Sequence, residues 1–160
     1  MYAFEPDPGQ PKARLYRELT EAARALTADE PDGVANMANV AALIWQFVPR
    51  LNWAGFYRLV DGELVLGPFQ GKPACIRIAL DQGVCGAAAA SGETQLVPDV
   101  HAFPGHIACD AASRSELVVP VRQGGRIIAV IDLDSPEPNR FDSEDAAGIE
   151  ALAEAIASLI

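Results

Sequence analysis

The spacing of apolar residues predicts two amphipathic helices in the first third of the chain. Between residues 12 and 27 the apolar positions recur at intervals of four, three and four, which is one helical stripe: Leu15, Leu19, Ala22 and Leu26. Pro11 can occupy the first turn of this helix. A second stripe begins after Gly33 and ends before Pro49: Val34, Met37, Val40, Ile44 and Phe47.

From Trp53 onward the pattern changes to short runs rich in β-branched and aromatic residues. Residues 53–60 and 63–69 flank Asp61 and Gly62, a pair typical of a tight hairpin turn. A second hairpin is expected near the C-terminus, with strands 116–123 and 126–134 joined at Gly124 and Gly125. Further elements are predicted as a strand at 75–80, a short Ala-rich helix at 83–92, a weak strand at 94–100 and a helix from about Ser143 to Leu159, capped by Asp142.

This order predicts an α+β domain, with an antiparallel sheet of about six strands that carries the N- and C-terminal helices mainly on one face. The other face and its loops are left to form a ligand pocket. Residues 101–115 show no periodicity, and so long an irregular segment in a compact domain is more often functional than a plain connector. We expect one domain over residues 1–160, with a loose Pro-rich leader at 1–10.

Composition and charge narrow the class of partner. Half of the 160 residues are apolar and the formal net charge is −10, so the chain should fold and should repel nucleic acids and anionic membrane surfaces. We expect no membrane span and no secretory signal, because the longest apolar stretch is too short and the N-terminus has neither a basic nor an apolar region. A cytoplasmic, reducing location is therefore expected, where structural disulfides are rare.

Three cysteines, Cys75, Cys85 and Cys109, are candidates for thiol chemistry. Cys109 lies in the irregular segment three residues after His106, and this makes it the leading nucleophile. Burial as small apolar residues is the plain alternative. A zinc site on His106 and Cys109 is disfavoured because Cys75 and Cys85 lie ten positions apart, and a cysteine hydrolase with His101 or His106 as base would leave two thiols unexplained.

Three acidic residues form a second candidate group. Asp132 and Asp134 are two positions apart on one predicted strand and so share a face, whereas Ile131 and Leu133 take the other face. Glu116 opens the strand that follows the irregular segment. Close carboxyls raise one another's pKa. Solvated turn residues are the alternative interpretation.

Trp53 and Tyr57 share a strand face in NWAGFY, with Gly55 between them leaving open space. Such a pair can hold an apolar group or a cation, although the spacing alone favours core packing.

The three cysteine contexts GPFQGKPAC, GVCG and GHIACDAAS, together with SELVVP and IDLDS, resemble the free methionine-(R)-sulfoxide reductases, which are built on a GAF-type domain. The similarity runs from about Asn52 to the C-terminal helix. It implies that Cys109 attacks, that Cys75 is the principal resolving thiol and that Cys85 is an auxiliary or alternative redox thiol. It also implies that three acids hold the sulfoxide and ammonium groups and that two aromatic residues lie against the S-methyl end: Glu116, Asp132, Asp134, Trp53 and Tyr57.

The reaction implied is reduction of free L-methionine-(R)-sulfoxide through a sulfenic acid and an intramolecular disulfide. Proton donation is assigned to Glu116 or Asp134, because a clustered carboxyl can stay protonated while another is charged. The resemblance further implies thioredoxin as reductant, no bound cofactor or metal, a role in oxidative-stress repair and a homodimer. The alternative is a GAF module that binds ligands or senses redox state without turnover.

Overall fold

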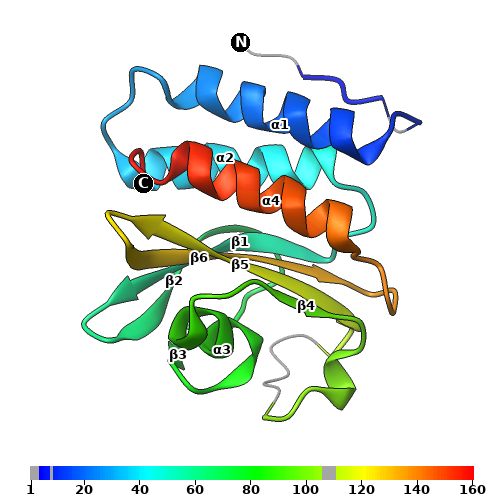
Figure 1. Cartoon of the computed structure of the whole chain (residues 1–160), viewed down its shortest axis with the longest axis vertical. Helices are drawn as coiled ribbons and strands as arrows, with labels where there is room; N and C mark the ends of the chain where they lie inside the picture. Colours follow the sequence, from blue (N-terminus) through cyan, green and yellow to red (C-terminus); the bar gives the residue numbers. More distant parts are fainter. Residues whose placement is uncertain (1–3, 8, 106–110) are drawn as a thin grey trace.

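The computed structural model describes residues 4–7, 9–105 and 111–160. Its sheet has six antiparallel strands in the order β3-β2-β1-β6-β5-β4 (Figure 1). In chain order the strands are β1 Trp53–Val60, β2 Glu63–Gly71, β3 Arg77–Ala79, β4 Gln95–Val97, β5 Ser115–Gln123 and β6 Arg126–Ser135. The helices are α1 Lys12–Thr27, α2 Gly33–Phe47, α3 Gly83–Ser91 and α4 Ser143–Ile156, with a 3₁₀ turn η1 at Val100–Ala102.

The sheet separates two helical layers of unequal size (Figure 1). Helices α2 and α4 cover one face and α1 packs across them, whereas the short α3 lies on the opposite face. The predicted apolar stripes of α1 and α2 pack in the first layer, with Leu26 half-buried, whereas Val34 at the start of the α2 stripe is 52% exposed. This arrangement confirms the expected α+β fold and leaves the α3 face for a pocket.

Asp145 ties the helical layer together. It accepts hydrogen bonds from Tyr16 Oη at 2.7 Å and from Lys12 Nζ at 2.6 Å, both on α1. Arg140, whose side chain is 2% exposed, donates to the same carboxylate at 3.3 Å. The expected cap is also present, because Asp142 and Asp145 form a capping box at the start of α4.

Strand β3 is shorter than expected. The 75–80 segment was predicted to be a strand that starts at Cys75, but β3 begins at Arg77. The carbonyl of Cys75 accepts a hydrogen bond from Tyr57 Oη at 2.9 Å rather than a ladder bond, and so Cys75 lies in the loop before the strand. Among the described residues no helix is long and apolar enough to cross a bilayer.

Candidate functional site

Two neighbouring strands carry the acidic residues onto the α3 face. Glu116 lies opposite Asp134 across the β5–β6 pair. Asp132 lies two residues before Asp134 on β6, opposite Val118. Leu117 and Leu133 point to the other face, where they are fully buried in the helical core. The alternation predicted for Asp132 and Asp134 is therefore present, and it aims the acids away from the main helices.

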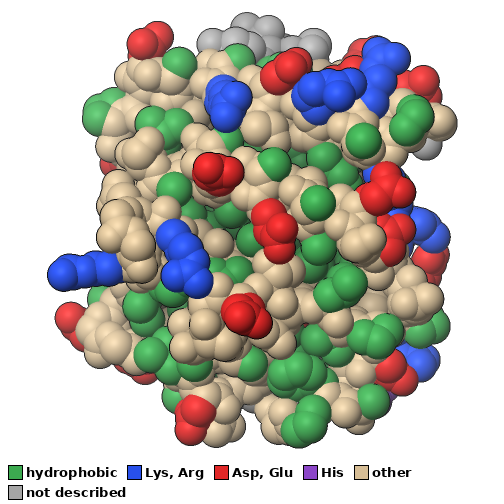
Figure 2. Space-filling model, in the orientation of Figure 1, with side chains coloured by type: hydrophobic (Ala, Val, Ile, Leu, Met, Phe, Trp, Pro, Cys, Tyr) green, Lys and Arg blue, Asp and Glu red, His purple; other side chains and the backbone are tan. Residues whose placement is uncertain are grey.

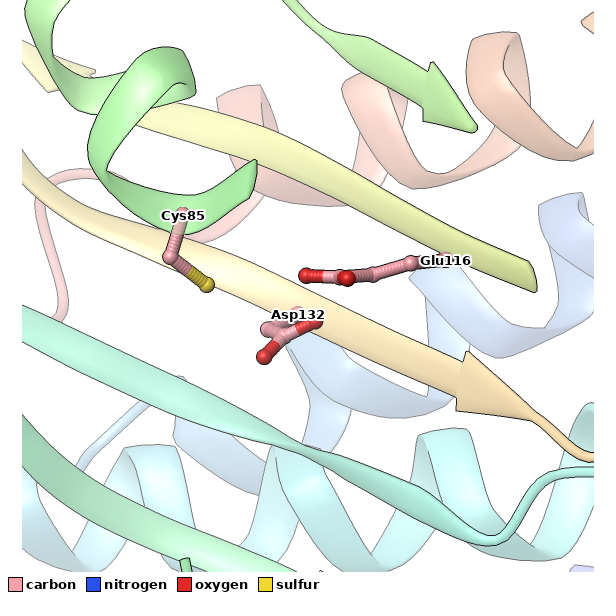
Figure 3. A group of neighbouring side chains, drawn as sticks. All are labelled: Cys85, Glu116 and Asp132. Carbon is pink, nitrogen blue, oxygen red and sulfur yellow. The ribbon is translucent and has the colours of Figure 1, made fainter. Parts of the chain in front are cut away.

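Helix α3 brings a thiol to these carboxyls. Its first turn carries Cys85, and the side-chain ligand atoms of Cys85, Glu116 and Asp132 all lie within 4.8 Å of one another (Figure 3). Gly86 permits this approach, because a β-carbon at that position would collide with the carbonyl oxygen of Ala79. One thiol and two carboxyls could also ligate a divalent cation such as Zn²⁺.

Burial dominates the electrostatics of this group. Burial, followed by repulsion from Asp132 and Asp134, raises the pKa of Glu116 well above its usual value. Burial also raises the pKa of Asp132 to about 7, against the lowering effect of its hydrogen bonds with Cys85 and Glu116. At neutral pH the pair of carboxyls Glu116 and Asp132 thus retains a proton that can be donated to a substrate.

Cys85 is a poor source of thiolate. It is a free cysteine, and 4% of its surface is exposed. Burial and the neighbouring charges of Asp132 and Glu116 raise the pKa of this thiol well above its ordinary value. Its S–H group hydrogen-bonds with Asp132, whose other oxygen, Oδ1, is buried and has no hydrogen-bond partner among the described residues.

Trp53 and Tyr57 form an aromatic wall next to the acids. Their rings stack with centroids 5.8 Å apart, and Gly55 and Trp53 on β1 lie opposite Asp132 and Asp134 on β6. The open space expected over Gly55 is absent, because a β-carbon there would collide with Phe69, which pairs with Gly55 and stacks on Trp53 at 5.2 Å. The expectation failed because strand alternation says nothing about the side chain on the neighbouring strand.

The same wall fixes the loop that carries Cys75. Trp53 Nε1 donates to the carbonyl of Lys72 at 3.1 Å, and Tyr57 Oη donates to the carbonyl of Cys75. Cys75 is half-buried and disulfide-bonded. The candidate nucleophile Cys109 and its neighbour His106 lie outside the described residues.

One pocket joins these groups. Its lining includes the predicted residues Trp53, Tyr57, Cys85, Glu116, Asp132 and Asp134. It also includes three polar residues that the sequence analysis missed: Lys72, Gln82 and Ser113. Each of the three lies in a loop, where no periodicity shows which way a side chain points. The motifs GHIACDAAS and GPFQGKPAC contain Ser113 and Lys72, so loop residues inside those motifs were the available signal.

Comparison with known proteins places this pocket in context. Residues 35–160 match the family described as the GAF domain. The free methionine-R-sulfoxide reductase of Escherichia coli (strain K12) is 49% identical over 141 residues, which cover 88% of this chain and 86% of that protein. Protein YtsP of Bacillus subtilis (strain 168) is 50% identical over 158 residues, which cover 98% and 96%. The X-ray structure of free methionine-R-sulfoxide reductase from Neisseria meningitidis in complex with its substrate superimposes with a TM-score of 0.93 at 45% identity, covering 99% of this chain and 98% of that one.

Proposed function

The chain belongs to the GAF-domain family of free methionine-R-sulfoxide reductases, and we propose that it reduces free L-methionine-(R)-sulfoxide to methionine in the pocket described above. The observation that carries the proposal is the buried Cys85–Glu116–Asp132 group, whose carboxyls hold a proton at neutral pH. Reduction of a sulfoxide needs this proton, because the oxygen must be protonated as it leaves sulfur.

We assign the attack to Cys109 and the resolving step to Cys75. The Cys109 thiolate attacks the sulfoxide sulfur while the sulfoxide oxygen takes up a proton. The substrate S–O bond then breaks and the oxygen passes to the cysteine sulfur, so that methionine leaves reduced by two electrons and Cys109 is oxidised to a sulfenic acid. The Cys75 thiol then displaces that oxygen as water and forms a disulfide. Two features support this division: Cys75 is half-buried and disulfide-bonded, whereas Cys85 is a free, buried thiol with a raised pKa.

Glu116 is the proton donor in this proposal. Its pKa is raised by burial and by two neighbouring carboxylates, so it is the acid that keeps its proton at neutral pH. Asp132 and Asp134 then bind the substrate ammonium, since the unpartnered Oδ1 of Asp132 offers a buried acceptor within the described part of the chain. Cys85 holds Asp132 by a hydrogen bond, and an auxiliary redox role for Cys85 stays a prediction.

The aromatic wall, Trp53 and Tyr57, binds the apolar S-methyl end of the substrate in this proposal. Trp53 and Tyr57 line the pocket beside the acids and present apolar surface to the S-methyl group. An ammonium group held by buried carboxylates restricts the site to the free amino acid, because a residue within a peptide has no ammonium to offer.

We also propose a cytoplasmic location, recycling by thioredoxin and a homodimer. Most of the α1 and α2 stripe residues are buried in the core of the chain, so they are not available to a dimer interface. Sedimentation of the reduced protein at micromolar concentration tests the oligomeric state: a mass of twice 17.0 kDa supports the dimer and a mass of 17.0 kDa refutes it.

The activity is tested by mixing reduced protein with free L-methionine-(R)-sulfoxide in the absence of another reductant. We expect one methionine formed for every two thiols lost. The (S)-sulfoxide and a blocked peptide that contains methionine-(R)-sulfoxide are the controls and should give none. A module that only binds ligand would lose no thiols, and this result would refute the proposal.

A further inference from the structure

An exposed isoleucine adjoins the disulfide-bonded cysteine. Ile76 directly follows Cys75 and is 71% exposed, compared with 52% for Val34 and 41% for Leu96. Isolated apolar residues on a surface are common and need no explanation alone. The position of Ile76 differs because any reductant of the Cys75 disulfide has to approach this part of the surface.

The backbone around Ile76 is held in place by two hydrogen bonds. Tyr57 Oη donates to the carbonyl of Cys75, and the amide of Leu66 donates to the carbonyl of Ile76 at 2.9 Å. Strand β3, which begins at Arg77, pairs with β2 and lies at one edge of the sheet. On its other side no strand pairs with it among the described residues, and such an edge can accept an extended segment of another protein.

Charge separates this loop from the rest of the surface. The chain carries a net charge of −10, but the charged residues within 71–80 are Lys72 and Arg77, both basic and both exposed. Arg77 forms an ion pair with Glu63 on the neighbouring strand β2. On the face of the molecule shown in Figure 2, acidic side chains are scattered among basic and apolar ones from the top of the view to the bottom. A partner with an acidic or neutral rim fits this loop.

We propose that Ile76, flanked by Lys72 and Arg77, is the docking contact for the protein dithiol that reduces the Cys75 disulfide. This inference rests on the proposed function. A thiolate of the partner attacks one sulfur of the disulfide, forms a mixed disulfide and releases the other cysteine of this chain. The second partner thiol then displaces the remaining cysteine, so that two electrons and two protons pass to this chain and the partner leaves as a disulfide.

The test compares a protein dithiol with a small one. Wild type, Ile76→Ser and Ile76→Glu are assayed for steady-state reduction of free L-methionine-(R)-sulfoxide with bacterial thioredoxin, its reductase and NADPH, and separately with dithiothreitol. We expect kcat/KM for thioredoxin to fall by at least about tenfold in Ile76→Ser and further in Ile76→Glu, because an apolar contact is lost and then an acid is introduced. Turnover with dithiothreitol should stay within about twofold of wild type, since that reductant needs no docking surface. Leu96→Ser is the matched control, because Leu96 is an exposed residue of β4, the strand at the opposite edge.

Two results overturn the docking contact: Ile76→Ser retains the wild-type kcat/KM for thioredoxin, or it lowers the thioredoxin and dithiothreitol rates equally. A wild-type protein that forms no methionine with dithiothreitol would instead refute the proposed function, and the docking contact with it.

Discussion

Asp132→Asn tests whether burial in the pocket raises the pKa of the Asp132 carboxyl. Burial raises the pKa of Asp132 from 3.8 to about 7. Because the folded state binds this proton more tightly than the unfolded state, stability falls as the pH rises from 3.8 through 7. Asparagine has nearly the same shape and cannot ionise, so the variant escapes this loss.

The magnitude follows from the shift in pKa. At about 1.4 kcal/mol per pKa unit, the raised pKa of Asp132 lowers the free energy of unfolding by about 2 kcal/mol at pH 5.5 and by about 4 kcal/mol at pH 8.5. The reference is a side chain that stays neutral in both the folded and the unfolded state. The free energy of unfolding of Asp132→Asn relative to wild type should therefore rise by about 2 kcal/mol between these pH values. The same variant should raise the KM for methionine sulfoxide by about tenfold to a hundredfold, because a charge-assisted bond to the ammonium is lost.

The assay is urea unfolding of both proteins, fully reduced and free of substrate, at pH 5.5 and pH 8.5. Asp29→Asn is the matched control for the exchange of a carboxyl for an amide, because Asp29 is exposed just after the end of α1. A difference between Asp132→Asn and wild type that is the same at both pH values would refute the conclusion that burial raises the pKa of this carboxyl.

Three further substitutions test how the site and its support are built. Cys85→Ser keeps a hydrogen-bond donor next to Asp132 and should retain single-turnover methionine release within about threefold of wild type, whereas complete loss would show that Cys85 is a required redox thiol. Gly86→Ala should destabilise the protein by about 1–3 kcal/mol in urea unfolding and raise the KM for methionine sulfoxide, because the added methyl group meets the backbone of β3. An unchanged KM would show that the position of α3 does not affect substrate binding. Asp145→Ala leaves the buried Arg140 and Tyr16 hydroxyl without their acceptor and should cost about 3–5 kcal/mol in the same unfolding assay, and a loss below about 1 kcal/mol would contradict the structural role of Asp145.

Much of the fold and of the acidic group follows from local patterns. Hydrophobic spacing predicted α1 and α2, turn residues predicted both hairpins, and strand alternation placed Asp132 and Asp134 on one face. These features depend on residues close together in the sequence, and so one sequence is enough to show them.

Other parts of the site depend on contacts between distant segments. Phe69 fills the space over Gly55 because β1 and β2 pair in one particular register, and Cys85 reaches Asp132 because Gly86 lets α3 approach β3. The depth of burial that raises the pKa of Glu116 is likewise a property of the assembled pocket. Periodicity along a single strand or helix carries no information about such contacts.

We propose that Cys109 attacks the sulfoxide and that Cys75 resolves the product. The most direct measurement is the methionine released in a single turnover, without added reductant, by reduced wild type, Cys109→Ser and Cys75→Ser. We expect about one methionine per chain from wild type and from Cys75→Ser, with a sulfenic acid trapped on Cys109 in the latter, and none from Cys109→Ser. Full methionine release by Cys109→Ser would contradict it.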